Sequence, residues 1–506
     1  MKIRTKDFPL SLNRVSQVKK ESSIKINAIF NATITVLNAL FPLITAPYLA
    51  RVLTPVGTGT YEYYYSIVAI FTMVVAFGFT DYGTKEVSVH RNDKNKYSLI
   101  FSEIFLSRFI ILAGVLSFYY ISIFANLFGS DNKTIMLLMS LNIISAGIDS
   151  TFAYQGLEKF KNLSIRNFLI KVLSLVLILI FVKTQADLTK YVLIMVSCQI
   201  LQAVFMITII INYISFSKIK FSNIVYCIKK SFIYFIPSIA VTLYTQVDKT
   251  MIGILSTKSE VGYYEQANKV ITVLTNIVNC LSPILLARLS YLFKIHNYEK
   301  AKDLLLKALR IVAILGLPCT FGLISIANTF IPAFFGIEYQ KSVLVSIILS
   351  MNVVTISTGS ILIFGYFIPT NQRNLSTIFS FIAAFSNVGL NYILIPKYGA
   401  AGAAFATLIA ETMVTVLNMI FSRKFINFKE YFYKLAKPFT ASLMMAIIVY
   451  LFCSLVSPHL HSTLTIIFSI VIGGGIYFDL LMLLREDLFV FYVKLVFNKI
   501  KSIIKK

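Results

Sequence analysis

Residues 243–270 read LYTQVDKTMIGILSTKSEVGYYEQANKV, and this stretch contains the features that decide the fold. It ends one long apolar segment, at 231–256, and begins the next, at 262–289. Four charged residues of the stretch lie inside these segments, namely Asp248, Lys249, Glu265 and Lys269. A segment of about 20 apolar residues spans the hydrocarbon core of a bilayer, and a charge inside it is costly. The stretch therefore predicts two membrane-spanning helices that carry buried charge.

Similar apolar segments recur along all 506 residues. The composition is 57% hydrophobic and only 14% charged, with a mean hydropathy of +0.78. A soluble protein of this length would need a larger polar surface than this chain can supply. We expect an all-α polytopic membrane protein with about fourteen transmembrane helices. Their predicted ranges are 27–50, 61–79, 100–128, 134–155, 164–183, 188–215, 231–256, 262–289, 306–331, 342–368, 374–395, 400–422, 438–456 and 463–484.

The basic residues follow the positive-inside pattern. Most of the 47 lysine and arginine residues lie in the two tails and in every second predicted loop. This bias predicts that both termini are cytoplasmic. The net charge of +25 suits membrane lipids with anionic head groups rather than nucleic acid, because the basic residues flank the apolar segments.

Two tracts of the chain resemble each other. Residues 51–62 read RVLTPVGTGTYE and residues 253–265 read GILSTKSEVGYYE, so that GTYE at 59–62 aligns with GYYE at 262–265. Each tract joins the first and second helix of a six-helix block. Internal repeats of this kind are typical of transporters, which place their substrate site where the repeats meet.

The repeat suggests a domain organisation. We expect a basic N-terminal tail at 1–26, a first lobe at 27–215, a linker at 216–230, a second lobe at 231–422, two further helices within 423–484 and a basic C-terminal tail at 485–506.

Asparagine side chains recur at helical spacing inside the apolar segments. Asn27, Asn31 and Asn38 lie along one face of the first predicted helix, and Asn276 and Asn279 continue the charged face of the eighth. Lipid would leave these amides without partners, so they must face other helices or water. Hydrogen bonding between helices would explain serine and threonine alone, whereas asparagine and charge together favour a polar cavity.

Three basic residues lie too deep in the apolar segments to reach the membrane surface. Arg108, Lys249 and Lys269 are each seven or eight residues from a helix end, or about 10–12 Å deep. Since Lys249 and Lys269 lie on neighbouring helices at similar depth, we expect them to converge on one cavity. Two ammonium groups in one cavity predict an anionic substrate group, such as a diphosphate.

The acidic residues inside the apolar segments suggest two further roles. We assign Asp248, Glu265 and Glu411 as counter-ions of the lysines or as sites for a coupled ion or proton. Asp149 and Lys171 lie at similar depth on consecutive helices, and we expect them to form a structural ion pair.

No cofactor, metal or catalytic residue is expected. The five cysteines are scattered, the four histidines form no metal-binding spacing, and no glycine-rich phosphate loop follows a strand. The chain is therefore interpreted as a non-enzyme that does not use ATP.

Five motifs, in order along nearly the whole chain, resemble the Wzx-type oligosaccharide flippases of bacteria. They are PLITAPYLARVLTPVGTGTYEYYYSIV (42–68), GFTDYGTKEVSVHR (78–91), AYQGLEKFKNLSIRNFLIKVLSL (153–175), the opening stretch at 243–270 and NYILIPKYGAAGAAFATLIAE (391–411). The resemblance implies membership of the superfamily of multidrug and oligosaccharidyl-lipid exporters. It implies two six-helix lobes in a V with two added helices.

The same resemblance implies a function and a location. The expected substrate is an undecaprenyl-diphosphate-linked oligosaccharide, moved from the inner to the outer leaflet of the bacterial cell membrane. A polysaccharide polymerase and a chain-length regulator are the implied protein partners. The two added helices would hold the lipid tail.

One departure from related lipid II flippases bears on the site. Those proteins carry basic residues in the first helix, where this chain has asparagine, so the anion site is expected on the helices of Lys249, Lys269 and Arg108. Two alternatives remain open. A cation-coupled multidrug exporter of the same fold would favour acidic cavities, and a membrane polymerase or ligase would need large outer loops, which this chain lacks.

Overall fold

The computed structural model describes residues 10–129, 132–215, 221–456 and 460–504. The side chains of 1–40, 42–43, 241, 244, 281, 283–284 and 496–506 lie outside that description. In the described part of the chain the regular secondary structure is helical throughout, with no β-strand.

The all-α polytopic class is confirmed. Among the described residues, ten helices are long and apolar enough to span a membrane, or eleven if the bent α8 (Phe221–Leu255) counts as one span. The number fourteen stays a prediction.

The chain divides into two compact units. Unit 1 comprises Met1–Phe41, Phe71–Lys183 and Thr189–Ser238, and unit 2 comprises Pro42–Ile70, Thr184–Leu188 and Ile239–Lys506. Residues 42–70 thus belong with the second half of the chain in this division. The predicted lobe boundaries stay a prediction.

Unit 1 is built around aromatic side chains. Phe101 stacks on Phe152 with 5.5 Å between ring centroids, and both are fully buried beside Phe79. Besides the first part of α1 and the start of α8, its helices are α2 (Phe79–Val89), α3 (Lys94–Phe124), α4 (Lys133–Ile148), α5 (Thr151–Gly156), α6 (Phe160–Phe181) and α7 (Leu188–Ile210).

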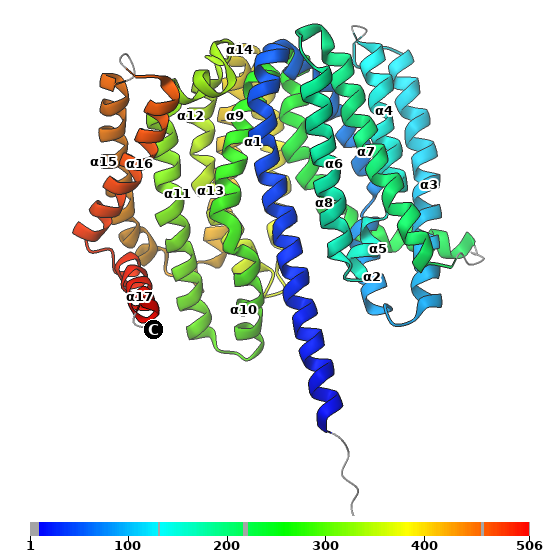
Figure 1. Cartoon of the computed structure of the whole chain (residues 1–506), viewed down its shortest axis with the longest axis horizontal. Coiled ribbons are helices and arrows are strands. Elements are labelled where there is room, and N and C mark those ends of the chain that lie inside the picture. The colour runs from blue at the N-terminus through cyan, green and yellow to red at the C-terminus, as the bar shows by residue number, and fades with distance from the viewer. Residues whose placement is uncertain (1–9, 130–131, 216–220, 457–459, 505–506) are drawn as a thin grey trace, which may run out of the picture. The chain divides into compact units, whose positions relative to one another are not determined.

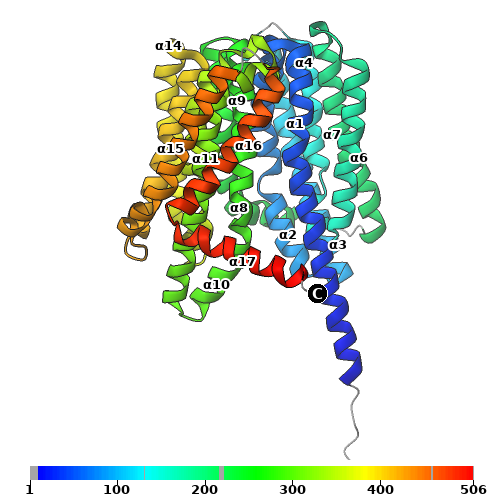
Figure 2. The ribbon, with the colours of Figure 1, turned by 60° about the vertical axis from the view of Figure 1, so that its left-hand side comes forward.

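Unit 2 contains most of the C-terminal helices. Within it, α15 and α16 pack against α11, and the three lie side by side in the two views of the ribbon (Figures 1 and 2). Besides the later part of α1 and the rest of α8, its helices are α9 (Lys258–Val278), α10 (Ser282–Lys294), α11 (Tyr298–Phe335), α12 (Ser342–Ser350), α13 (Asn352–Leu362), α14 (Arg373–Ser422), α15 (Phe428–Val456), α16 (Ser462–Leu483) and α17 (Asp487–Ile504).

The predicted loop between 50 and 61 is helical, which corrects the sequence interpretation. Helix α1 runs from Leu10 to Ala76 and is interrupted only at Thr54, which has φ 59° and ψ 174°. Thr54 precedes Pro55, and the residue before a proline is disfavoured in the helical region. Pro55 then begins the second helical part, because the first turn of a helix needs no backbone donor from it.

The two repeated tracts meet in unit 2 through their glycines. A Cβ atom on Gly59 would overlap the Lys258 carbonyl oxygen and lie 2.7 Å from the Gly262 backbone nitrogen. A Cβ atom on Gly262 would in turn overlap the Pro55 carbonyl oxygen. The later part of α1 and the start of α9 therefore touch backbone to backbone. Glu62 and Glu265, each three residues after its glycine, are brought to the same level.

Candidate functional site

Four charged side chains of unit 2 form one cluster, which we call the four-charge cluster. It consists of Glu62 on α1, Lys249 on α8, and Glu265 and Lys269 on α9. Lys249 Nζ lies 3.2 Å from Glu62 Oε2 and 3.3 Å from Glu265 Oε2. Lys269 Nζ lies 3.3 Å from Glu62 Oε1 and 3.9 Å from Glu265 Oε1. Each ammonium group thus contacts both carboxylates.

The cluster is deeply buried except at one corner. Glu62, Lys249 and Glu265 are at most 8% exposed, whereas the Lys269 side chain is 26% exposed. Buried ions persist only when opposite charges and hydrogen bonds compensate for lost hydration. The protein supplies that compensation itself, so the two lysines need no bound anion at rest. Lys269 is the corner that a ligand from outside can reach.

Asp248 on α8 forms a second site, with partners from α9 and α14. Its carboxylate is 2% exposed and accepts hydrogen bonds from Tyr264 Oη at 2.7 Å and Thr407 Oγ1 at 2.6 Å. Asn391 Nδ2 donates to Asp248 Oδ1 at 2.5 Å and to Asn387 Oδ1 at 3.0 Å. Asp248 is adjacent in sequence to Lys249, yet the two side chains have different partners. The Asp248 site is therefore a buried carboxylate among neutral oxygen and amide groups.

An apolar cavity of about 570 Å³ lies in unit 2, and its wall includes residues of α9, the helix that carries Glu265 and Lys269. Val270 and Leu274 line it from α9, in the turns that follow Lys269. The other lining residues come from α11, α15, α16 and α17, and include Gly322, Met445, Gly473 and Phe489. Helix α9 thus carries the exposed corner of the ionic cluster and one wall of a large apolar cavity.

Arg108 belongs to unit 1, whereas Lys249 and Lys269 belong to unit 2. It is 1% exposed and donates to the Asp149 backbone oxygen and, at 2.8 Å, to Thr80 Oγ1. The Phe79 and Phe152 rings lie 5.9 and 5.4 Å from its guanidinium carbon. These contacts account for the buried charge without a substrate.

The predicted Asp149–Lys171 ion pair stays a prediction, and the structure gives Asp149 other partners. The Asp149 carboxylate lies 3.9 Å from Arg108, and its Oδ1 accepts the Thr151 backbone and hydroxyl hydrogens. Asp149 follows the last residue of α4, and its side chain binds the first residue of α5. Lys171 Nζ lies 5.1 Å from the Phe41 ring centroid.

The remaining predicted residues are dispersed. Asn276 is exposed on α9, and Asn279 begins the short helix that follows α9. Glu411 is partly buried on α14, one turn beyond Thr407. The side chains of Asn27, Asn31 and Asn38 lie outside the described residues.

Sequence reasoning missed Glu62, which is one half of the acidic pair. The signal was present, because GTYE at 59–62 aligns with GYYE at 262–265 and so pairs Glu62 with Glu265. It also missed Tyr264, Thr407, Asn387 and Asn391, whose approach to Asp248 depends on how α14 packs against α8 and α9.

The fold is that of known membrane transporters. The lipid II flippase MurJ, in an inward closed conformation, matches with a TM-score of 0.73 over 91% of this chain and 99% of its own, at 18% identity. An inward-facing multidrug transporter of the MATE family, in the MOP superfamily, matches with a TM-score of 0.58 over 78% of this chain and 97% of its own, at 14% identity. These likenesses establish the architecture.

Sequence comparison identifies the family. Residues 24–285 match the polysaccharide biosynthesis protein family, and the chain belongs to this family. A relative from Escherichia coli K12, named as a candidate O-antigen transporter, is 24% identical over 79% of this chain and 97% of its own length.

Proposed function

We propose that this protein is a flippase that moves an undecaprenyl-diphosphate-linked oligosaccharide from the inner to the outer leaflet of the cell membrane. The observation that carries the proposal is that one helix, α9, contributes both to the four-charge cluster and to the wall of the apolar cavity. A lipid-linked diphosphate has an anionic group directly attached to a long apolar chain. A binding site for this ligand needs cations for the diphosphate and apolar surface for the attached chain. Helix α9 supplies a cation through Lys269 and apolar surface through Val270 and Leu274.

The cluster suggests how the anion is bound and released. An arriving diphosphate competes with Glu62 and Glu265 for the two ammonium groups. Lys269 is reached first because it is the exposed member, and its longer contact with Glu265, 3.9 Å, is the weakest of the four. When the anion leaves, the two lysines re-form their ion pairs with Glu62 and Glu265. Release therefore leaves no buried positive charge without a partner.

The apolar cavity accommodates part of the lipid chain in this proposal. Its walls are formed by α9, α11, α15, α16 and α17, and its volume of about 570 Å³ lies within the usual range for small-molecule sites. The rest of a long polyprenyl chain would remain in the bilayer. Alternating access, in which the site faces one leaflet and then the other, is the proposed transport cycle.

The direct experiment compares surface polysaccharide in cells that depend on this protein. Lys249→Ala combined with Lys269→Ala removes both cations and is expected to abolish export. Lys341→Ala is the matched control, because Lys341 is a highly exposed lysine of the same unit that pairs with Glu260. Normal export by the double variant, at equal protein level in the membrane, would overturn the proposal.

The Asp248 site favours coupling of transport to a proton or a small cation. A carboxylate surrounded by hydroxyl and amide groups can exchange those hydrogen bonds for a bound ion. This feature would also suit the alternative function, a cation-coupled multidrug exporter. The exposed corner of the four-charge cluster favours an anionic substrate instead, since Lys269 is the member that a cationic drug would meet first.

A further inference from the structure

The C-terminal segment forms a helix that the sequence interpretation treated as a basic tail. Helix α17, Asp487–Ile504, follows the last spanning helix α16 after a short turn. In that turn Arg485 has a φ of 48°, in the left-handed region. The turn changes the direction of the chain, and Figure 2 shows α17 running across the direction of α16 and α11.

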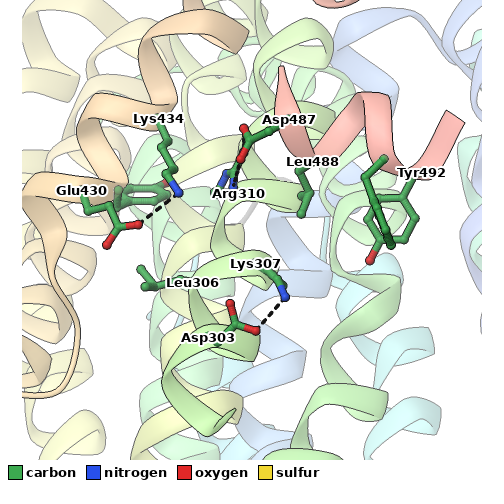
Figure 3. A pocket seen from close by; sticks show the side chains of 11 residues that line it. Asp303, Leu306, Lys307, Arg310, Glu430, Lys434, Asp487, Leu488 and Tyr492 are labelled. Carbon is green, nitrogen blue, oxygen red and sulfur yellow. Dashed lines mark hydrogen bonds and ion pairs between the residues drawn. The ribbon is translucent and has the colours of Figure 1, made fainter. Parts of the chain in front are cut away.

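Arg310 holds the start of α17 through ion pairs with Glu486 and Asp487, and we call this contact the clasp. This arginine of α11 is 8% exposed and donates to Asp487 Oδ2 at 3.2 Å and to Asp487 Oδ1 at 2.5 Å. It also donates to Glu486, which is 1% exposed and whose Oε2 accepts the Phe489 backbone hydrogen at 2.7 Å. Figure 3 shows the Arg310 side chain of α11 directed at Asp487, the first residue of α17.

Apolar contacts reinforce the clasp. Leu488 is 7% exposed in the core formed by α11, α15 and α16, and Phe489 packs edge-on against Phe478 of α16 at 5.1 Å between centroids. The first turn of α17 is therefore held at a fixed place. Because α16 has 22 residues and so a length of about 33 Å, that place lies at the edge of the hydrocarbon layer.

Beyond its first turn, α17 carries exposed apolar and basic side chains, and two of them, Phe491 and Tyr492, border a pocket that α17 shares with α11 and α15. Phe491, Tyr492 and Leu495 are 59%, 46% and 48% exposed, and Lys494 is exposed beside them. The sequence continues with Lys499 and Lys501 among further apolar residues. A helix that combines aromatic and aliphatic residues with lysines is the type that lies in the interface of an anionic membrane.

We propose that α17 lies in the plane of the membrane interface and binds anionic phospholipid. Its aromatic and leucine side chains enter the boundary between head groups and acyl chains, and its lysines contact the phosphates. The clasp at Arg310 sets the depth of the helix relative to α16. The complementary charge of the basic segment selects an anionic lipid surface over a zwitterionic one.

The test measures hydrogen–deuterium exchange of the full chain in nanodiscs. One preparation contains phosphatidylcholine alone, and the other contains phosphatidylcholine with phosphatidylglycerol, which is present in both leaflets and so makes the result independent of orientation. Peptides covering 487–504 are expected to exchange at least threefold more slowly with phosphatidylglycerol. Peptides from α16 serve as the internal reference for folding.

Charge reversal identifies the contacts. Lys494→Glu with Lys499→Glu and Lys501→Glu should remove the difference between the two lipids, and Tyr492→Ser with Leu495→Ser should speed exchange in both. Lys94→Glu with Lys96→Glu, at exposed lysines in the first turn of α3, should leave the difference intact. Equal exchange of α17 in both lipids, or an unchanged difference in the lysine variant, would refute the proposal. Neither outcome depends on whether the protein transports oligosaccharides.

Discussion

Lys249 has two carboxylates within 3.3 Å and almost no access to solvent, so its charge is balanced by the protein before any substrate arrives. Sequence reasoning placed two ammonium groups in one cavity, predicted an anionic substrate group there, and assigned Glu265 or Asp248 as the resting counter-ion. In the structure Glu265 is such a partner, and Glu62 is the second, so the four charges form a neutral arrangement. A substrate anion must therefore exchange with Glu62 and Glu265 rather than occupy a vacant cationic site.

Glu62→Gln tests the mutual support of these charges. Loss of one buried carboxylate leaves uncompensated positive charge, and breaking a buried pair typically costs about 3–5 kcal/mol. We expect a marked loss of thermal stability for the purified protein in detergent. Adding Lys269→Gln restores neutrality and should recover part of that loss, giving a non-additive double-mutant cycle. Additive effects of the two substitutions would contradict the cluster.

Asp248→Asn tests the proposed coupling site. The substitution keeps the shape of the side chain and removes its charge, so transport should become insensitive to the cation or pH gradient that drives the wild-type protein. The measurement is uptake of a labelled lipid-linked oligosaccharide in proteoliposomes with imposed sodium or proton gradients. Asp81→Asn, at an exposed aspartate, is the control. A variant that keeps the gradient dependence of the wild type would rule out Asp248.

At the scale of elements, the contact between α1 and α9 depends on the absence of side chains. Gly59→Ala should place a methyl group against the Lys258 carbonyl, and overpacking of this kind costs about 1–3 kcal/mol. Gly114→Ala on α3 is the matched control, because no atom lies within 4 Å of its added Cβ. Alanine there should be neutral or stabilising by up to about 1 kcal/mol from helix propensity. The measurement is the thermal unfolding temperature of both variants in detergent. A similar change in that temperature for Gly59→Ala and Gly114→Ala would refute the close contact.

The clasp on α17 makes a prediction about pH. Burial raises the pKa of Asp487, but the hydrogen bonds and charge of Arg310 outweigh burial and hold that pKa below its usual value of 3.8. A carboxylate with a lowered pKa contributes stability above its ordinary range and loses it only as pH falls through the lowered value. Exchange of the α17 peptides should therefore stay constant from neutral pH down to about 5 once corrected for the intrinsic rate. Asp487→Asn should speed it throughout, and a change for the wild type within this range would contradict the clasp.

At the scale of the whole molecule, the sign of the substrate charge distinguishes the two transport functions. A diphosphate with a charge near −2 gains about 4–5 kcal/mol per 100 mV on moving outward across an inside-negative membrane. Outward transport in proteoliposomes should accelerate when a potassium diffusion potential makes the interior negative, and should slow when the potential is reversed. A cationic drug would show the opposite dependence. A transport rate that ignores the potential would argue against the net movement of an anion.

The primary sequence was sufficient for the properties that depend on local composition. Apolar segments of membrane-spanning length predicted the all-α polytopic class, and the motifs at 42–68 and 243–270 predicted the family that the comparisons then showed. The repeat also contained Glu62, although its role was not recognised. Lys249, Lys269 and Glu265 were predicted to share a site because their depth and helical face follow from spacing alone, and in the structure they lie together.

Only the tertiary structure decided which charges compensate one another. Arg108 and Asp149 lie 41 positions apart, and Asp248 and Thr407 lie 159 apart, so no periodicity relates them. The ionic partners of a buried group are chosen by the helix that packs beside it, and that choice depends on the rotation and crossing of helices distant in sequence. The same reason applies to α17, whose direction is set by Arg310 on a helix that ends 152 residues before it begins. Residue spacing determined which side chains lie on each helix face, whereas helix packing determined which partners each charged side chain contacts.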